Sequence, residues 1–219
     1  MPKRRGWGLW VPAVTGVVGL LCAALGLAVV LTGGYSVHRM AGDTMRPGLR
    51  PGDRMLSDRM LSDRVAAGDV RRGEIYLVDS PWMLDHPVVS RVVALGGDRL
   101  VCAGGRLTLN GEPPDEPAAR LADSCYADFD VTVPPGRAFL MGDQRAHAVD
   151  SRLTAQSGQQ GTVELAKLTG GRVVWHSGPG TPALPGKLVG AVLLLSLGAV
   201  LGLGGLVGAV VTATRRRTA

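Results

Sequence analysis

Aromatic side chains are scarce in this 219-residue sequence, where they make up 4% of the residues although 46% are hydrophobic. Its apolar content is therefore mainly aliphatic, as is typical of lipid-facing helices. Charged residues are absent from two long stretches, residues 7–33 and residues 188–211, which are 27 and 24 residues long. About 20 apolar residues suffice to cross a bilayer as a helix. These stretches predict two transmembrane helices and exclude a freely soluble protein.

Acidic residues are missing from both ends of the sequence. Residues 1–33 carry three Lys or Arg and residues 187–219 carry four, with no Asp or Glu in either segment. The 153 residues between them carry 17 Lys or Arg and 18 Asp or Glu, a net charge of −1. The basic surplus is therefore a topology signal and argues against a nucleic-acid-binding surface. By the positive-inside rule, we expect a two-pass plasma-membrane protein with both ends in the cytoplasm and the middle outside.

The first apolar stretch has a second interpretation, because a charged start and an apolar core also mark a cleaved signal peptide. Its 27 residues exceed the 7–15 expected of such a core, which favours an uncleaved anchor. The second stretch contains six glycines, which permit close approach between helices. Pairing of the two predicted helices is left open.

The predicted organisation has five parts. Residues 1–33 form a cytoplasmic tail and the first anchor, and residues 34–176 form an external domain. Residues 177–187, rich in Gly and Pro, form a linker to a second transmembrane helix at residues 188–211. Residues 212–219 form a basic cytoplasmic tail.

The external part lacks any long amphipathic helical pattern. Short β-branched runs at residues 74–78, 88–94, 131–133 and 171–175 are separated by turn sequences rich in Gly, Pro and Asp. Residues 107–111 (Leu-Thr-Leu-Asn-Gly) are expected to form one arm of a hairpin with its turn. The predicted fold class is therefore mostly β.

Cysteine is rare, with three residues in the whole sequence. Cys22 lies in the first apolar stretch, where it is most simply a small apolar residue, whereas Cys102 and Cys125 lie in the external part. That compartment is oxidising, so a disulfide between them is expected, with two unpaired thiols as the alternative. The bond would close a 24-residue loop and contribute about 3 kcal/mol.

Three short segments carry the chemistry. They are residues 42–49 (Gly-Asp-Thr-Met-Arg-Pro-Gly-Leu), residues 89–98 (Val-Ser-Arg-Val-Val-Ala-Leu-Gly-Gly-Asp) and residues 141–152 (Met-Gly-Asp-Gln-Arg-Ala-His-Ala-Val-Asp-Ser-Arg). In that order, after an N-terminal anchor, they resemble the motif boxes of the bacterial type I signal peptidases. These are membrane-bound serine endopeptidases that remove signal peptides from exported preproteins.

The resemblance spans roughly residues 36–176 and implies a signal-peptidase-like β-barrel catalytic domain, flanked here by the two transmembrane helices. It implies that the partners are the signal peptides of exported preproteins and the lipid bilayer. It implies a Ser/Lys dyad, with no metal and no cofactor. No oligomeric state is predicted.

The dyad positions of the family are altered in this sequence. Thr44 stands at the position of the nucleophilic Ser, and Ser90 stands at the position of the Lys that acts as general base. Ala148 stands where relatives have a Ser that hydrogen-bonds the Lys amine. Thr keeps a hydroxyl but crowds the scissile carbonyl, whereas a serine hydroxyl cannot accept a proton near neutral pH. His147 is the most plausible substitute base, and a surface-loop histidine is the alternative.

Other family features are kept. The backbone N–H of Thr44, together with Gly42, is expected to form the oxyanion-stabilising corner. Met45 and Pro47 resemble the apolar rim near the nucleophile, with plain packing as the alternative. By resemblance, a supporting ionic and hydrogen-bonded network comprises Arg91, Asp143, Arg145, Ala148, Asp150, Ser151 and Arg152. A purely structural role for this network is the other interpretation.

Two functional hypotheses follow. In the first, the chain is a signal peptidase I-like endopeptidase that removes signal peptides from preproteins. In the second, it is an inactive pseudo-peptidase that binds signal peptides or membrane partners without cutting them, since loss of a general base typically costs about 10² to 10⁴ in rate.

Overall fold

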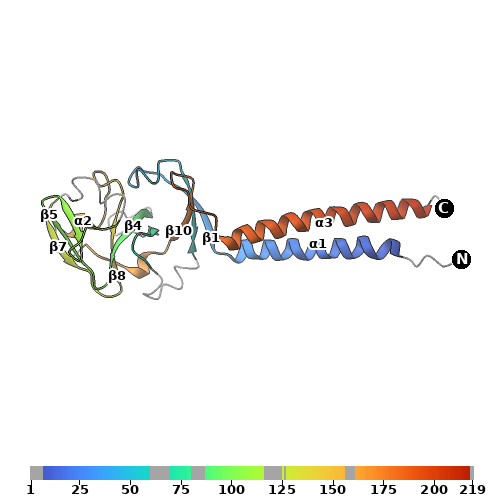
Figure 1. Cartoon of the computed structure of the whole chain (residues 1–219), viewed down its shortest axis with the longest axis horizontal. Helices are drawn as coiled ribbons and strands as arrows, with labels where there is room; N and C mark the ends of the chain where they lie inside the picture. Colours follow the sequence, from blue (N-terminus) through green and yellow to red (C-terminus); the bar gives the residue numbers. More distant parts are fainter. Residues whose placement is uncertain are drawn as a thin grey trace. The chain divides into compact units, whose positions relative to one another are not determined.

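The computed structural model describes residues 7–59, 70–79, 87–115, 125, 127–155 and 161–217. The chain folds into two compact units (Figure 1). One unit comprises the two ends of the chain, Met1–Gly34 and Leu184–Ala219, and the other comprises Tyr35–Ala183.

The first unit consists of two long helices, α1 (Trp7–Thr32) and α3 (Gly186–Arg217). Within them, Trp10–Thr32 and Gly186–Arg215 are long and apolar enough to cross a membrane. Large aliphatic side chains stay exposed along both helices, as a lipid environment requires. The second helix begins two residues before the predicted start at 188 and continues through the predicted basic tail as far as Arg217.

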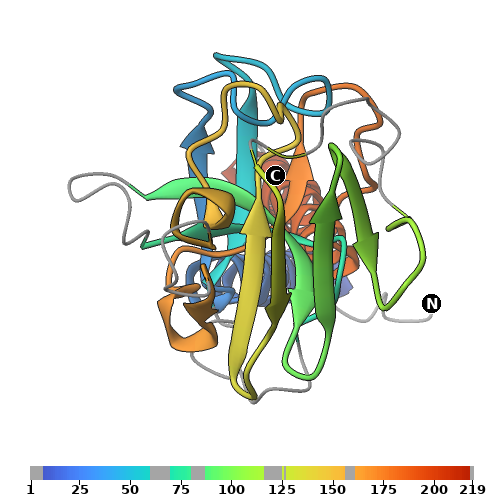
Figure 2. The same cartoon turned by 90° about the vertical axis from the view of Figure 1, so that its left-hand side faces the viewer.

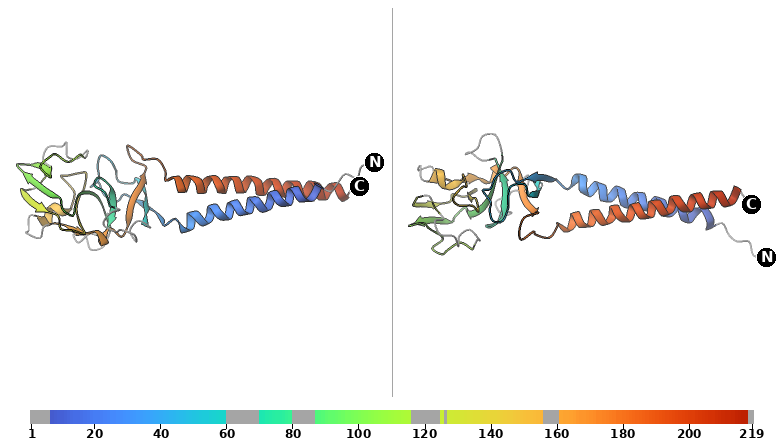
Figure 3. Two further views of the ribbon diagram at one scale, coloured as in Figure 1. Left: turned by 60° about the horizontal axis from the view of Figure 1, so that its bottom comes forward. Right: turned by 90° about the horizontal axis from the view of Figure 1, so that it is seen from above.

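The two helices pack side by side in antiparallel orientation (Figure 3). Glycines lie where their backbones meet. A Cβ at Gly19 would lie 2.5 Å from the Gly202 nitrogen, and one at Gly198 would lie 2.6 Å from the Ala23 nitrogen. Such contacts are closer than real Cβ atoms allow, so only glycine fits at these positions. The pairing that the sequence left open is therefore present.

The second unit is built from two antiparallel sheets (Figure 2). The larger sheet has seven strands in the order β1-β2-β10-β3-β4-β8-β9, and the smaller has three in the order β6-β5-β7. The strand bounds are β1 Tyr35–Arg39, β2 Arg54–Asp58, β3 Ile75–Val78, β4 Val88–Leu95, β5 Arg99–Ala103, β6 Arg106–Leu109, β7 Phe129–Thr132, β8 Arg137–Met141, β9 Val163–Glu164 and β10 Gly171–His176. A short helix, α2 (Ser151–Ala155), and a 3₁₀ turn, η3 (Leu165–Lys167), complete the described elements of this unit.

The mostly β prediction is confirmed, and the four β-branched runs coincide with β3, β4, β7 and β10. The hairpin arm expected at residues 107–111 pairs with a different strand than the sequence predicted. The arm β6 pairs with β5, which precedes it, through a turn at Gly104 and Gly105 with φ values of 56° and 76°. The Asn110-Gly111 turn forms as predicted but is followed by a single bridge between Leu109 and Glu112. Proline follows at 113 and 114, and proline has no N–H to extend a ladder.

Apolar side chains from both sheets fill the interior. One cluster joins β5 and β7 to β4 and β8, and includes stacked Phe129 and Phe139 rings with centroids 5.5 Å apart. Cys102 belongs to this cluster and is joined to Cys125 by a disulfide. A second cluster surrounds Met45 and Leu49 from the first motif box, and both side chains are fully buried. The packing alternative for Met45 is therefore correct, and this residue is not part of an exposed rim.

Candidate active site

The first motif box forms the turn between β1 and β2. Buried Met45 and Leu49 anchor it, and the Leu49 N–H donates to the Met45 carbonyl at 2.9 Å. Thr44 is partly exposed at the start of this turn, and Gly42 is exposed with open space around it. Within the part of the chain that the structure describes, no acceptor pairs with the Thr44 N–H. This backbone donor is therefore free to meet a ligand.

The first and last motif boxes meet at Thr44. The Gln144 N–H donates to the Thr44 carbonyl at 2.9 Å. A Cβ at Gly142 would lie 2.6 Å from the same carbonyl oxygen and 2.4 Å from the Ala148 Cβ. Gly142 thus permits an approach that a side chain would block. The structure brings together Thr44 and Ala148, which the sequence separates by about 100 residues.

The position expected for the general base is occupied by a buried hydroxyl. Ser90 lies in the middle of β4, opposite Tyr76 of β3, and is 1% exposed. No lysine lies in the described part of β4 or in the described segments of the last box. Lys167 is exposed on η3, and Lys187 belongs to the helical unit. No described lysine therefore replaces the missing amine.

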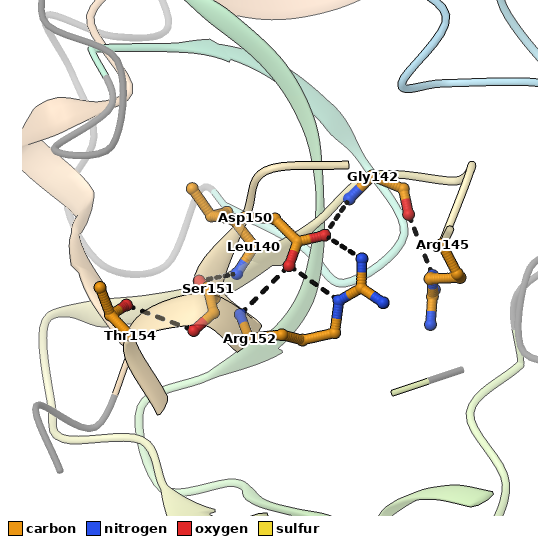
Figure 4. Close-up of polar contacts among 7 residues, drawn as sticks. All are labelled: Leu140, Gly142, Arg145, Asp150, Ser151, Arg152 and Thr154. Carbon is orange, nitrogen blue, oxygen red and sulfur yellow. Dashed lines mark hydrogen bonds and ion pairs between the residues drawn. The ribbon is translucent and has the colours of Figure 1, made fainter. Parts of the chain in front are cut away.

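A buried ion pair organises the last box (Figure 4). The Asp150 carboxylate accepts hydrogen bonds from the Gly142 N–H at 3.0 Å and from the Arg152 N–H, Nε and Nη2 at 3.1, 2.8 and 2.8 Å. Asp150 and Arg152 are fully buried, as is Ser151, whose Oγ accepts the Leu140 N–H at 2.9 Å. Because these bonds pair the buried charges, the network fixes the backbone after β8. The contacts of Asp150, Ser151 and Arg152 agree with a purely structural role for this network.

A second ion pair ties the base strand to the last box. Arg91 donates through Nε and Nη2 to the two carboxylate oxygens of Asp143 at 2.7 and 2.6 Å, and through Nη1 to the Gly73 carbonyl at 2.6 Å. The Arg145 Nε donates to the Gly142 carbonyl at 3.0 Å. Arg91 thus joins β4 to the turn after β8, and Arg145 closes a contact within that turn.

His147 lies against the first box. Its Nδ1 is 3.7 Å from Oδ2 of Asp43, the residue just before Thr44. The side chains of His147 and Asp43 are 61% and 45% exposed. The sequence singled out His147 but not Asp43, because Asp43 is as compatible with an ordinary turn residue as with a partner for an imidazole.

A cavity of about 460 Å³ lies next to the first box, lined by Pro47, Gly48, Ile75, Arg91, Asp143 and His176 among others. Burial lowers the pKa of His176, and the Arg91 charge lowers it further, against the opposing effect of Asp53. Sequence reasoning missed His176, because nothing near the end of β10 distinguishes it from any strand residue. Among the described residues, no group of three or more His, Cys, Asp or Glu could hold a metal ion.

Comparisons of the sequence with known proteins agree on one family. Signal peptidase I of Mycobacterium tuberculosis (strain ATCC 25618 / H37Rv) is 39% identical over 109 residues, which cover 42% of this chain and 37% of that protein. Signal peptidase I of Bacillus licheniformis is 28% identical over 159 residues, which cover 68% of this chain and 80% of that protein. A crystal structure of a signal peptidase I from Enterococcus faecalis V583 aligns with 24% identity over 45% of this chain and 92% of that chain, with a TM-score of 0.36.

The chain thus spans little more than a third of the mycobacterial relative's length. The family model described as signal peptidase, peptidase S26, matches residues 10–176, which include most of the first helix, all three motif boxes and β10. On this match over most of its length, the chain belongs to the signal peptidase family, peptidase S26.

Proposed function

We propose that this protein acts on the signal peptides of exported preproteins and removes them without a Ser/Lys dyad, much more slowly than a relative whose dyad is complete. Family membership supports the substrate class. The observation that carries the proposal is the contact of the first and last boxes at Thr44, where the Gln144 N–H holds the Thr44 carbonyl at 2.9 Å. Thr44 is partly exposed at this contact and carries both a hydroxyl and a backbone N–H that has no acceptor among the described residues.

Each part of this site has a role in acyl transfer. The Thr44 hydroxyl is the nucleophile, and the Thr44 N–H with the open corner at Gly42 stabilises the oxyanion that forms on the scissile carbonyl. The Arg91–Asp143 and Asp150–Arg152 pairs position this corner through Gly142. The altered residues lower the rate of the chemical step more than they lower binding.

A second candidate function is binding without cleavage. It is favoured by Ser90, which is buried where relatives carry an amine, and by Ala148, which has no hydroxyl to orient one. A backbone corner that binds a peptide carbonyl survives both changes. Such a protein would hold signal peptides at the membrane surface.

We further propose that the domain of residues 34–176 lies outside the plasma membrane and that both ends of the chain lie in the cytoplasm. Two apolar helices of sufficient length support membrane anchoring. The seven Lys and Arg in the acid-free terminal segments support the orientation. Residues 177–187 then link the domain to α3, whose first residues overlap the end of this linker.

The test uses the full chain purified in detergent. A preprotein and the corresponding labelled signal peptide are each added, so that cleavage and binding are measured separately. We expect peptide binding that a scrambled peptide does not reproduce, together with slow cleavage that Thr44→Val abolishes. The valine keeps the shape of Thr44 and removes its hydroxyl. Binding without cleavage would favour the second candidate, and absence of both would contradict the proposed substrate class.

A further inference from the structure

We infer that Asp43 and His147 supply the general base that the altered dyad lacks, with Asp43 orienting the imidazole and His147 accepting the proton of the Thr44 hydroxyl. The inference rests on the proposed function and names the base for the same site. The relatives' arrangement does not contain it, because there the base is a Lys on the strand that carries Ser90 in this chain.

The pair flanks two motif positions that the structure brings together. Asp43 directly precedes Thr44, and His147 directly precedes Ala148, whose Cβ faces Gly142 across from the Thr44 carbonyl. The 3.7 Å between Asp43 Oδ2 and His147 Nδ1 is the distance of an ion pair without a close hydrogen bond. Catalytic hydrogen bonds in ligand-free sites are often long and tighten when substrate binds.

Backbone hydrogen bonds fix His147 with respect to Thr44. The His147 N–H donates to the Gln144 carbonyl at 3.0 Å, and the Gln144 N–H donates to the Thr44 carbonyl at 2.9 Å. Only these two bonds separate the imidazole-bearing residue from the nucleophile's own backbone. With Nδ1 turned to Asp43, Nε2 is the ring nitrogen left to act on a proton.

The other side chains in the described part of the domain that could act as a base are less well placed to accept the Thr44 proton. His38 Nε2 is engaged with the buried Ser57 Oγ at 3.1 Å, on the strand pair β1 and β2. Lys167 is exposed on η3, away from the three boxes in sequence. His176 lines the cavity beside Pro47 and Gly48 and is therefore the competing base that the experiment must separate from His147.

The chemistry balances with these residues alone. The Thr44 oxygen attacks the scissile carbonyl carbon while its proton moves to His147 Nε2, giving a tetrahedral oxyanion held by the Thr44 N–H. The C–N bond breaks, and the new amino terminus leaves with the proton from Nε2. Water then attacks the Thr44 ester and gives one proton to Nε2, which passes it to the Thr44 oxygen as the ester C–O bond breaks. The signal peptide leaves as a carboxylic acid and loses its remaining proton to solvent water.

The experiment measures preprotein cleavage by the full chain and five single variants: His147→Ala, His176→Ala, Asp43→Asn, Thr44→Val and Val149→Ala. We expect His147→Ala to lower the rate about 10² to 10⁴ fold, as removal of a general base does. Free imidazole added to His147→Ala should restore part of the lost rate but should not revive Thr44→Val. Asp43→Asn should lower the rate less than His147→Ala does, because it weakens only the orientation of the ring.

Val149→Ala is the matched control. It shortens an exposed side chain two residues after His147 and leaves both backbone bonds in place, so its rate should equal that of the wild type. A full rate in His147→Ala, or a loss confined to His176→Ala, would overturn the inference. Specific signal-peptide binding with no cleavage above the Thr44→Val background would also overturn it while leaving the binding function standing. Absence of specific binding would contradict the proposed function itself.

Discussion

The guanidinium of Arg91 and the carboxylate of Asp143 form a bidentate pair across 52 residues of sequence, with N–O distances of 2.7 and 2.6 Å. Arg91 follows Ser90 on β4, and Asp143 follows Gly142 at the end of β8. The pair therefore fixes the strand that carries the base position against the turn that contacts Thr44. Their side chains are 15% and 4% exposed, so water screens the pair little.

Breaking this pair should destabilise the domain strongly. Arg91→Gln leaves the Asp143 carboxylate buried without its main partner, and loss of one member of a buried pair costs about 3 kcal/mol or more. The matched control is Arg99→Gln, because Arg99 makes a similar bidentate pair with Asp130 in which both side chains are at least half exposed. We expect a clear drop in melting temperature, followed by circular dichroism, for the first variant and little change for the second. Equal drops would show that burial does not govern the pair.

Restoring the dyad should increase the cleavage rate. A lysine at position 90 would lie in a strand where Ser90 is 1% exposed, and burial lowers the pKa of an amine toward that of a usable base. Thr44→Ser combined with Ser90→Lys should therefore cleave preproteins at least about 10² fold faster than the wild type. Adding Ala148→Ser should increase the rate further by orienting the amine.

Two controls accompany the restored dyad. Thr44→Ser alone should change the rate little, because it adds no base. In the variant with the new lysine, His147→Ala should have a much smaller effect than in the wild type. A double variant no faster than the wild type, despite unchanged folding, would contradict the assignment of positions 44 and 90.

The glycine contacts between α1 and α3 predict a position-dependent effect on helix pairing. Gly198→Val would place a side chain within 3 Å of the α1 backbone, whereas Gly204→Val in the same helix meets open space. The free cysteine Cys22 on α1 is partly buried, and its reaction with a thiol-reactive dye during heating reports opening of the pair. We expect Cys22 to react at a lower temperature in Gly198→Val and at an unchanged temperature in Gly204→Val. The disulfide should keep Cys102 and Cys125 unlabelled.

The proposed topology predicts the pattern of protease protection. With the chain in the plasma membrane of spheroplasts, external protease should digest the domain of residues 34–176 and spare tags at both ends. Opening the cells with detergent should expose both tags and serves as the control. Digestion of the tag after residue 219 in intact spheroplasts would contradict the proposed orientation.

The lowered pKa of His176 predicts a pH-dependent stability. Burial lowers this pKa first, with the Arg91 charge adding to the effect against Asp53. Since the unfolded value is about 6.5, the unfolded chain binds the proton more readily than the folded chain just below that pH. The free energy of unfolding should therefore fall as the pH drops below about 6.5.

The measurement compares melting temperatures near pH 7.5 and near pH 5.5 in the wild type and in His176→Asn. The decrease on acidification should be smaller in the variant. Part of it should persist, because burial, together with the Arg59 charge, also lowers the pKa of His38. An identical decrease in both proteins would exclude a contribution from His176.

Several structural features of this protein could be predicted from local features of its sequence. Two charge-free stretches predicted α1 and α3, because a span needs only length and apolarity. The β-branched runs predicted four strands, since their preference for extended backbone is local. The order of the three boxes predicted the family that the comparisons identified. The altered dyad at Thr44, Ser90 and Ala148 is a prediction from the sequence alone.

The tertiary structure decided which residues and elements lie next to one another. The burial of Met45 and the close packing of glycines between the helices depend on partners distant in sequence. The same holds for the 3.7 Å between Asp43 and His147, residues that come from two different turns. Local propensity carries no information about such distances, because they arise only when the whole set of strands is packed into one core.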